Sequence, residues 1–217
     1  MSRERVYEYP GEEIDVSWNQ GLCIHIGECG RSQGDLFVGG RQPWCQPDMI
    51  HVDNVAEIVE RCPSGALAYQ FKDGSVTETP AGENTVVTSY RGPLFVRGDL
   101  QIEGASDKKP GVRFRAALCR CGQSKNKPFC DNTHIEVEFD DTGAVGETGG
   151  ELSPEVTQLK IRPSKNGPYL LSGNVTIKAS SGREAWHGTK VALCRCGGSQ
   201  NKPFCDGTHA RNGFQSE

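Results

Sequence analysis

The chain repeats LCRCGQSKNKPFCDNTH (Leu118–His134) as LCRCGGSQNKPFCDGTH (Leu193–His209), and this repeat decides how the chain is organised. The offset is 75 residues, and the same offset relates GPLFVRGDLQI (Gly92–Ile102) to GPYLLSGNVTI (Gly167–Ile177). Since no net insertion separates the copies, the unit is duplicated as a whole. Its pattern predicts short strands bounded by glycine, followed by a cysteine-rich loop.

Each loop contains C-x-C-x8-C-x3-H, a set of three cysteines and one histidine that suits a thiolate-binding metal. The candidate ligands are Cys119, Cys121, Cys130 and His134 in the first copy, and Cys194, Cys196, Cys205 and His209 in the second. The same set also makes a closed tetrahedral zinc site, so ligand identity alone leaves zinc open. The C-x-C pair favours two ligands on one iron, with the C-x3-H pair on a second iron.

The C-x3-H pair predicts local structure. If a helix begins near Asp131, Cys130 and His134 lie on one face of its first turn. Asp131 and the equivalent Asp206 are the expected N-caps. The copies differ at the next position, which is Asn132 in one and Gly207 in the other. Both residue types tolerate a positive φ, so we expect the turn to be kept.

The wider motif, C-x-C-x2-S-x3-P-x-C-D-x-T-H, resembles the CDGSH iron–sulfur family of mitoNEET-like proteins. Its further positions are Ser124, Pro128 and Thr133, then Ser199, Pro203 and Thr208. The resemblance implies one 2Fe-2S cluster on each set of three Cys and one His. It also implies two cluster-binding lobes below a β-cap, here formed as a pseudodimer within one chain, so we expect a monomer. The sequence departs from mitoNEET in lacking a membrane anchor and in its longer spacing between motifs.

A second cysteine pattern precedes the repeat. C-x-H-x-G-x-C (Cys23–Cys29), Pro43-Trp44 and RCPSGALAY (Arg61–Tyr69) resemble the divergent single-cluster ferredoxin-like domain over Glu8–Phe71. The resemblance implies a 4Fe-4S cluster on Cys23, Cys29 and Cys62. Three thiolates alone can also hold a 3Fe-4S cluster.

The fourth ligand of this N-terminal cluster is open between Cys45 and His25. For Cys45 the alternative is a free buried thiol, because free cysteine is among the most buried residue types. For His25 the alternative is a hydrogen bond to a cluster sulfide or to the backbone.

The predicted fold class is α+β, mostly β with short helices. Residues 1–78 form the ferredoxin-like domain, 85–139 the first CDGSH unit, 140–154 a linker and 155–217 the second CDGSH unit. We expect the linker to be flexible, since Asp140–Pro154 is rich in Gly, Thr and acidic residues.

Periodicity and turn residues predict the local elements. These are a hairpin of Val6–Tyr9 and Ile14–Trp18, a helix over Val52–Arg61 with Asp53 or Asn54 as its cap, a strand over Ala66–Phe71, and turns at Gly98-Asp99 and Gly173-Asn174.

Composition excludes several functions. A net charge of -4 gives no pull toward nucleic acid or membrane, and no apolar run is long enough to span a bilayer. With no export signal, the ten cysteines favour metal ligands over disulfides, and we expect a cytoplasmic protein. We see no phosphate loop, nucleotide fingerprint or catalytic triad, so an enzyme is the least favoured class. His51 and His187 have no ligand-spaced partner and are expected to be surface or structural residues. Trp18, Trp44 and Trp186 are expected to lie in the core or to cover the small lobes.

The favoured function is electron transfer between these clusters and unidentified redox protein partners. Cluster transfer or redox sensing is the second hypothesis, and a zinc-stabilised interaction module the third. Basic residues near the sites either neutralise cluster charge, belong to a solvated face, or dock an acidic partner. They are Arg120, Lys125, Lys127, Arg195 and Lys202. A histidine ligand is expected to raise the cluster potential relative to cysteine.

Overall fold

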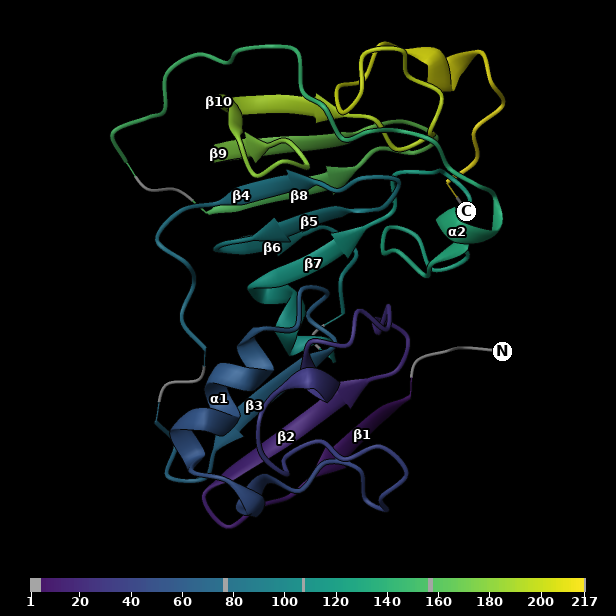
Figure 1. The fold of residues 1–217 in the computed structure, drawn as a ribbon. Helices are drawn as coiled ribbons and strands as arrows, with labels where there is room; N and C mark the ends of the chain where they lie inside the picture. The colour runs from purple at the N-terminus through teal and green to yellow at the C-terminus, as the bar shows by residue number, and fades with distance from the viewer. Residues whose placement is uncertain (1–4, 76–77, 107, 156–157, 217) are drawn as a thin grey trace.

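Two β-sheets organise the part of the chain that the computed structural model describes, residues 5–75, 78–106, 108–155 and 158–216 (Figure 1). The strands are β1 (Val6–Tyr9), β2 (Ile14–Asn19), β3 (Leu67–Phe71), β4 (Thr85–Thr88), β5 (Leu94–Arg97), β6 (Leu100–Ile102), β7 (Arg115–Leu118), β8 (Leu159–Pro163), β9 (Tyr169–Lys178) and β10 (Glu184–Leu193). The α-helices are α1 (Val52–Glu60) and α2 (Thr133–Glu136), and the 3-10 turns are η1 (Cys29–Arg31), η2 (Pro47–Met49), η3 (Pro110–Arg113) and η4 (Thr208–Ala210). The prediction of a mostly β chain with short helices is confirmed.

The N-terminal lobe is built on an antiparallel sheet in the order β1-β2-β3, with α1 packed on it. Val55, Ile58 and Val59 form the buried stripe of α1, as the sequence periodicity predicted. The predicted cap is wrong, because His51 precedes the helix in an extended conformation and its Nδ1 accepts the Asp53 N–H at 3.3 Å. His51 is therefore structural, as expected.

Among the described residues, the larger sheet has seven strands in the order β6-β8-β9-β4-β5-β7, with β10 paired to β9. The turn predicted at Gly98-Asp99 separates β5 from β6, but the one predicted at Gly173-Asn174 is wrong. There β9 continues without a break, because Gly173 takes a φ of 118° and bends the strand within its ladder.

Both repeat units contribute to this one sheet. Strand β6 pairs in parallel with β8, and β4 pairs in parallel with β9, so each unit lends a strand to the other. The pair Gln101↔Lys160 and the pair Thr85↔Thr176 correspond to each other at the 75-residue offset. The buried residues of both units accordingly form a single hydrophobic cluster, which includes Val86, Leu100, Ile161 and Ile177.

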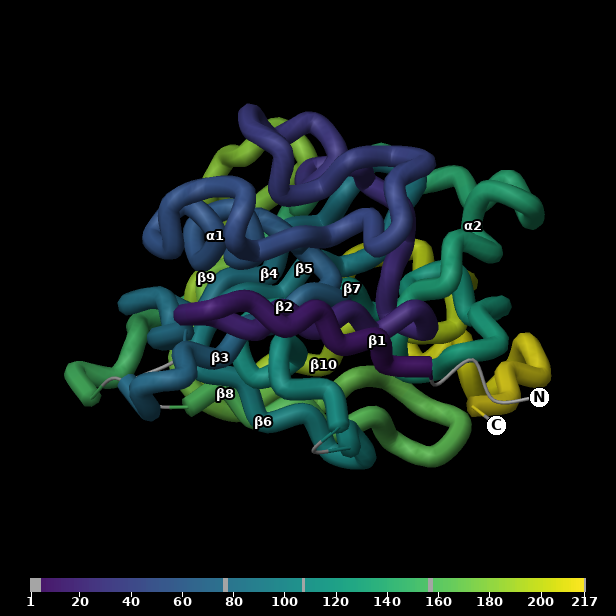
Figure 2. The backbone as a smooth tube through the Cα atoms, turned by 90° about the horizontal axis from the view of Figure 1, so that it is seen from below, coloured from purple at the N-terminus to yellow at the C-terminus, as the bar shows by residue number. Residues whose placement is uncertain are grey.

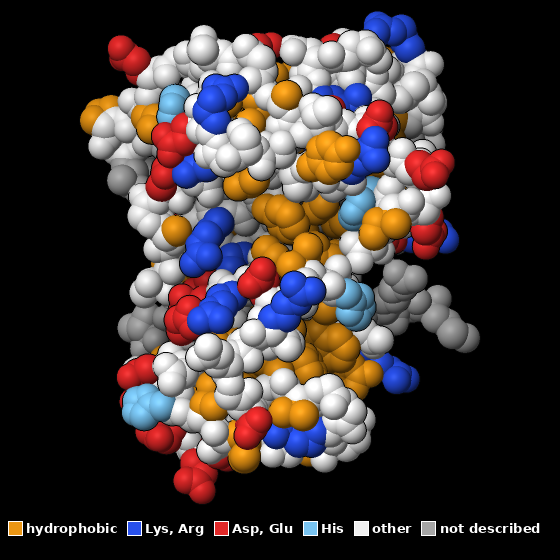
Figure 3. Space-filling view, in the orientation of Figure 1, with side chains coloured by type: hydrophobic (Ala, Val, Ile, Leu, Met, Phe, Trp, Pro, Cys, Tyr) orange, Lys and Arg blue, Asp and Glu red, His pale blue; other side chains and the backbone are white. Residues whose placement is uncertain are grey.

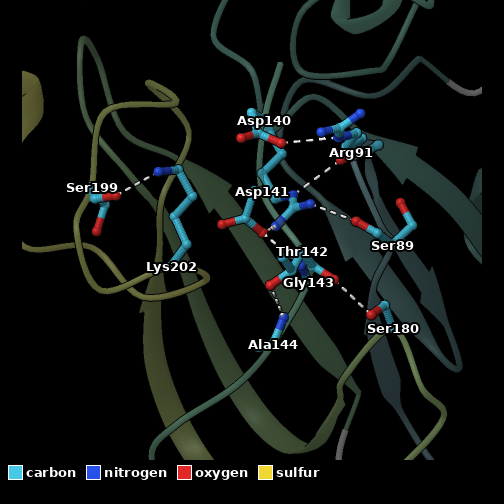
Figure 4. A network of polar contacts seen from close by, with 12 residues as sticks. Ser89, Arg91, Asp140, Asp141, Thr142, Gly143, Ala144, Ser180, Ser199 and Lys202 are labelled. Carbon is cyan, nitrogen blue, oxygen red and sulfur yellow. Dashed lines mark hydrogen bonds and ion pairs between the residues drawn. The ribbon is translucent and has the colours of Figure 1, made fainter. Parts of the chain in front are cut away.

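The segment predicted to be a flexible linker makes specific contacts with other loops (Figure 4). Asp140 pairs with Arg91 at 2.9 Å, and Asp141 pairs with the buried Arg120. Further along, the Ser180 hydroxyl donates to the Thr142 carbonyl at 2.7 Å. The acidic residues at the start of this segment therefore form ion pairs with arginines that lie far from them in the sequence.

The N-terminal lobe lies against the first repeat unit, in front of β5 and β7 when seen from below (Figure 2). The contact at Gly65 and Gly111 is so close that a Cβ on Gly65 would lie 2.8 Å from the Gly111 carbonyl oxygen. From β7, Arg115 crosses the boundary and donates to the carbonyls of Val59 at 2.6 Å and Leu67 at 3.2 Å. The two lobes are therefore joined through buried hydrogen bonds.

No helix in the described ranges is long and apolar enough to cross a membrane. The predicted domain ranges include residues 1–4, 76–77, 107, 156–157 and 217, which lie outside the described residues.

Candidate metal centres

The two cysteine-rich loops share one backbone frame. In the first, the Cys119 N–H donates to Pro128 O at 2.9 Å, and the Cys130 N–H donates to Ala117 O at 2.8 Å. The equivalent bonds in the second loop join Cys194 to Pro203 at 2.7 Å and Cys205 to Ala192 at 2.9 Å. Each loop is thus folded back onto the strand that delivers its first cysteine.

The motif serine and aspartate brace this frame. Ser124 Oγ donates to Phe129 O at 2.7 Å, and Asp131 accepts the N–H groups of Lys125 at 2.9 Å and Thr133 at 3.1 Å. The aspartate therefore closes an Asx turn instead of serving as the predicted helix cap. The helix starts two residues after Asp131, at Thr133, and in the second copy it is only a 3-10 turn.

The expected positive φ is confirmed at the position where the motifs differ. Asn132 has a φ of 71° and Gly207 a φ of 82°. In each loop the N–H of this residue points at the preceding cysteine, with 3.4 Å between Asn132 N and Cys130 Sγ and between Gly207 N and Cys205 Sγ. Such N–H groups stabilise a thiolate, which is the form that binds a metal.

The predicted ligands of each loop stand as two pairs. The Sγ atoms of Cys119 and Cys121 are 3.8 Å apart, and Cys130 Sγ is 3.4 Å from Nδ1 of His134. The second loop has a Cys194–Cys196 separation of 3.9 Å and a Cys205–His209 separation of 3.5 Å.

These spans fit metal coordination. A tetrahedral ion with bonds of ~2.3 Å to sulfur and ~2.0 Å to nitrogen holds two sulfurs about 3.8 Å apart, and a sulfur and a nitrogen about 3.6 Å apart. Among the described residues, no group of three or more His, Cys, Asp or Glu side chains could hold one metal ion. Each loop thus offers two pairs, and each pair spans the distance that one ion requires.

Burial sets the protonation of the first set of ligands. Burial raises the pKa of the Cys130 thiol to about 12. The hydrogen bond with Cys119 lowers the pKa of the Cys121 thiol. Burial also lowers the pKa of His134. The thiols must lose their protons when a metal binds, and a neutral imidazole is ready to ligate.

Two of the basic residues near the sites are interior, so for them a solvated face and partner docking are wrong. Arg120 and Arg195 are only 1% and 4% exposed, so neither can dock an acidic partner. Arg120 donates to Gly92 O at 3.0 Å, and its guanidinium lies 5.1 Å from the Phe139 ring. Arg195 donates to Ser164 O at 3.1 Å and lies 5.7 Å from the Phe214 ring. These arginines stabilise the loops from within.

Lys127 and Lys202 donate back to their own loops, at 2.7 Å to Ser124 O and 2.6 Å to Ser199 O, the latter drawn in Figure 4. Lys125 remains exposed.

The two C-x-C-G turns touch each other across the repeat units. A Cβ on Gly122 would lie 2.7 Å from Cys196 O, and a Cβ on Gly197 would lie 2.6 Å from Cys121 O. The contact is therefore reciprocal. Tyr169, buried in the second unit, adds hydrogen bonds to Cys119 O at 2.9 Å and Pro128 O at 2.8 Å. The sequence analysis missed this link between the centres, which only tertiary structure brings about.

We expect Gly122→Ala to destabilise the fold by roughly 1 to 3 kcal/mol more than Gly182→Ala does. Both glycines have a similar positive φ, 81° and 84°, so both substitutions strain the backbone. A Cβ at Gly182 meets nothing within 4 Å, whereas one at Gly122 meets the other loop. The difference between the unfolding free energies of the two variants, measured in urea, gives the contribution of the contact between the loops. Equal losses of stability would show that the loops can separate freely.

Three of the four N-terminal cysteines line a cavity of about 410 Å³, a volume in the range of cofactor sites. Its lining includes Cys23, Cys29, Cys62 and His25, and Trp18 is one of its two tryptophans. Burial raises the pKa of Cys29, and the nearby thiols of Cys62 and Cys23 raise it further. The three predicted ligands therefore face one space, and their donor chemistry suits an iron–sulfur cluster.

The two candidates for a fourth ligand lie differently. His25 lines the cavity, and its Nδ1 is 3.9 Å from Cys23 Sγ. Cys45 is 1% exposed, belongs to the hydrophobic core of the N-terminal lobe and does not line that cavity. Burial raises the pKa of the Cys45 thiol to about 12. The geometry gives His25 the better access.

The remaining histidine and tryptophan candidates contact ordinary side chains of the fold. His187 lies 3.3 Å from the Thr176 hydroxyl, and Trp186 packs against Phe204 at a ring distance of 6.0 Å. Trp44 lines the N-terminal cavity and donates to the Tyr9 hydroxyl at 2.5 Å. The three tryptophans thus pack against the hydrophobic clusters of the lobes, as expected.

Comparison with known proteins supports both kinds of centre. Residues 9–72 match the family model described as a divergent 4Fe-4S mono-cluster, and residues 91–135 and 166–210 each match the model described as an iron-binding zinc finger of CDGSH type. A stretch of 64 residues is 47% identical to the "Uncharacterized protein YjdI" of Escherichia coli strain K12 and to its namesake in strain O157:H7. The match covers 30% of this chain and 84% of each relative. No solved structure matches the chain.

Proposed function

The chain belongs to the iron–sulfur proteins in which a divergent 4Fe-4S mono-cluster domain precedes two CDGSH-type iron-binding domains, and on that premise we propose that it is an electron carrier. In this proposal the two loops hold 2Fe-2S clusters and the N-terminal cavity holds a 4Fe-4S or 3Fe-4S cluster. The ligands are the eight loop residues of the two C-x-C-x8-C-x3-H sets together with Cys23, Cys29 and Cys62.

The observation that carries the proposal is the separation of the loop ligands into two pairs. Cys119 and Cys121 at 3.8 Å, and Cys130 and His134 at 3.4 Å, each span one tetrahedral ion. Two such pairs suit two irons, whereas a single zinc ion needs all four ligands around one point. The repetition of both distances in the second loop supports the same assignment there.

Each cluster would supply one-electron redox chemistry, and the chain's residues would set its potential. One neutral imidazole among three thiolates makes a site less negative than four thiolates would. The buried Arg120 and Arg195 add positive charge beside the first and second loops. In each loop the histidine ligand and the neighbouring arginine act in the direction of a higher potential.

We propose an intrachain pseudodimer as the fold that carries the two loops. The exchanged strands β4 and β8, which pair with β9 and β6 of the other unit, and the reciprocal contact of Gly122 with Gly197 support a pseudo-two-fold relation between the units. The N-terminal lobe is proposed as the ferredoxin-like domain.

Metal analysis of the anaerobically purified chain tests the assignment. We expect about seven or eight irons per chain, with matching acid-labile sulfide and no stoichiometric zinc. Two irons from each loop and three or four from the N-terminal cavity make up this number. A colourless chain that contains zinc and no iron would contradict the proposal and favour a zinc-stabilised interaction module.

Single substitutions assign the N-terminal irons. Cys62→Ala is expected to lose the three or four N-terminal irons while both loops keep theirs. Cys45→Ala is the matched control, because this thiol lies outside the cavity, and it should keep the N-terminal signal in Mössbauer and EPR spectra. Loss of that signal in Cys45→Ala would instead make Cys45 a ligand.

Cluster transfer or redox sensing is the second candidate function. It is favoured by the partial exposure of Cys196 and Cys205, since ligands that solvent reaches can be attacked by an acceptor. Transfer to an apo-ferredoxin at acidic pH, faster than loss to a chelator, would support this function over electron transfer alone.

A further inference from the structure

The two loops have the same predicted ligands but different neighbours. Asn132 Nδ2 donates to Ile24 O at 2.8 Å, and Asn126 Nδ2 donates to Gly21 O at 2.7 Å. Both acceptors flank Cys23 in the N-terminal lobe. The first loop is therefore tied by two side chains to the very segment that lines the N-terminal cavity.

An apolar contact completes this junction. Ile24 is buried, and it forms one hydrophobic cluster with Cys130 and Ala117, with Phe95 packed against it. The cluster places an isoleucine side chain directly over a ligand of the first loop. Figure 3 shows hydrophobic side chains gathered where the lower lobe meets the upper one.

The second loop has no such cover in the contacts of the described residues. Gly207 stands where Asn132 does and has no side chain, and Asn201, the counterpart of Asn126, donates to Glu147 at 2.5 Å. The effect on the ligands is measurable in the structure. Cys121 and Cys130 are 8% and 4% exposed, whereas Cys196 and Cys205 are only partly buried.

We propose that the N-terminal lobe is a cover for the first loop, held by Asn126 and Asn132, so that the second loop is the exchange site of the protein. Metal bound at the first loop is retained, and metal bound at the second is open to small chelators and acceptor proteins. Exchange at the first loop requires the 21–24 segment of the lobe to lift, which breaks the hydrogen bonds from Asn126 and Asn132 and exposes Ile24. This inference rests on the proposed ligand sets and does not depend on which metal they hold.

The test uses the metal-loaded full chain, an excess of 2,2′-bipyridine as the chelator, and pulses of iodoacetamide. A cysteine becomes alkylated only after its metal has left, so mass spectrometry of the peptides dates the loss at each loop. We expect Cys205 to be labelled at least about tenfold faster than Cys130. Rates that agree within about twofold would overturn the proposal.

Matched variants identify the cover. Asn132→Gly reproduces the residue found at the second loop, and it is expected to bring the Cys130 rate to within about threefold of the Cys205 rate. Gly207→Asn is the control, since its φ accepts asparagine and no lobe lies there to bind. It should leave the Cys205 rate unchanged. An unaltered Cys130 rate in Asn132→Gly would refute the role of this residue.

A second pair guards against an indirect effect. Asn126→Ala removes only the bond to Gly21, and Asn201→Ala removes the corresponding bond to Glu147. The first variant is expected to speed labelling of Cys130, and the second to leave it unchanged. If the chain holds zinc instead of iron, the same labelling assay is run with a zinc chelator. The iron content then tests the electron-carrier proposal, and the ratio of the two labelling rates tests this inference.

Discussion

Replacing His134 or His209 with cysteine will lower the reduction potential of the affected loop by roughly 100 to 300 mV. Two histidine ligands raise the reduction potential of a 2Fe-2S centre by a few hundred millivolts relative to four cysteines. One histidine should therefore account for about half of that difference. The physical cause is charge, because a thiolate adds a negative charge that a neutral imidazole lacks. The structure places both imidazoles alike, with Nδ1 at 3.4 Å and 3.5 Å from the paired Sγ atom.

Voltammetry of each single variant measures this shift, after iron analysis has established that the loop is loaded. The native potentials should rise as pH falls, because reduction strengthens proton binding to an imidazole ligand, and the cysteine variants should respond less. His187→Gln is the control, since this histidine contacts Thr176 and lies outside both ligand sets. Potentials that stay within ~20 mV of native in both cysteine variants would remove the argument that histidine tunes these sites.

Arg115→Met will destabilise the protein by about 3 to 5 kcal/mol. Arg115 is 1% exposed and pairs with the buried Glu78 at 2.6 Å while donating to carbonyls of α1 and β3. Its loss leaves a buried carboxylate and two carbonyl groups without these donors. Arg113→Met, two residues away, removes a half-exposed pair with Asp99 and is expected to cost under about 1 kcal/mol.

The cost of Arg115→Met is also expected to depend on pH. Burial raises the pKa of Glu78 to about 7 even though Arg115 opposes the rise. Without the arginine this pKa should be higher still, so the folded state holds a proton that the unfolded state releases. Stability of the variant is therefore lost as pH rises from about 5 to 8. Urea unfolding of Arg115→Met at about pH 5 and about pH 8 measures this loss of stability. The double variant Glu78→Gln/Arg115→Met is the reference, because it has no carboxyl group to titrate at this position. A cost that does not change with pH would mean that Glu78 finds another partner.

Local sequence spacing predicted the parts that depend on neighbouring residues. The cysteine pairs, the positive φ at Asn132 and Gly207, and the buried stripe of α1 all follow from residues within one turn or one helix. The helix caps were wrong although their partners are local, whereas other contacts were missed because their partners are distant in sequence. The ion pair of Asp141 with Arg120 is an example, since Arg120 comes from another loop.

One signal for the junction of the lobes was present in the sequence. Asn132 is one of three residues by which the first loop departs from the second, and its side chain reaches the N-terminal lobe. The difference between the two loops is visible in the sequence, but its meaning is not. No neighbouring residue indicates that the Asn132 side chain donates to a carbonyl in the N-terminal lobe. The exchange of β4 and β8 between units is equally non-local.

The strand exchange between the units has a consequence for how such a protein can evolve. In a symmetric pair of identical chains, every substitution is made at both sites at once. Here the two units share one sheet and one polypeptide, so a mutation falls on a single side. Asn132 and Gly207 have diverged while the eight predicted ligands remained matched. Fusion of the halves thus frees one of them to acquire a new neighbour without imposing it on the other.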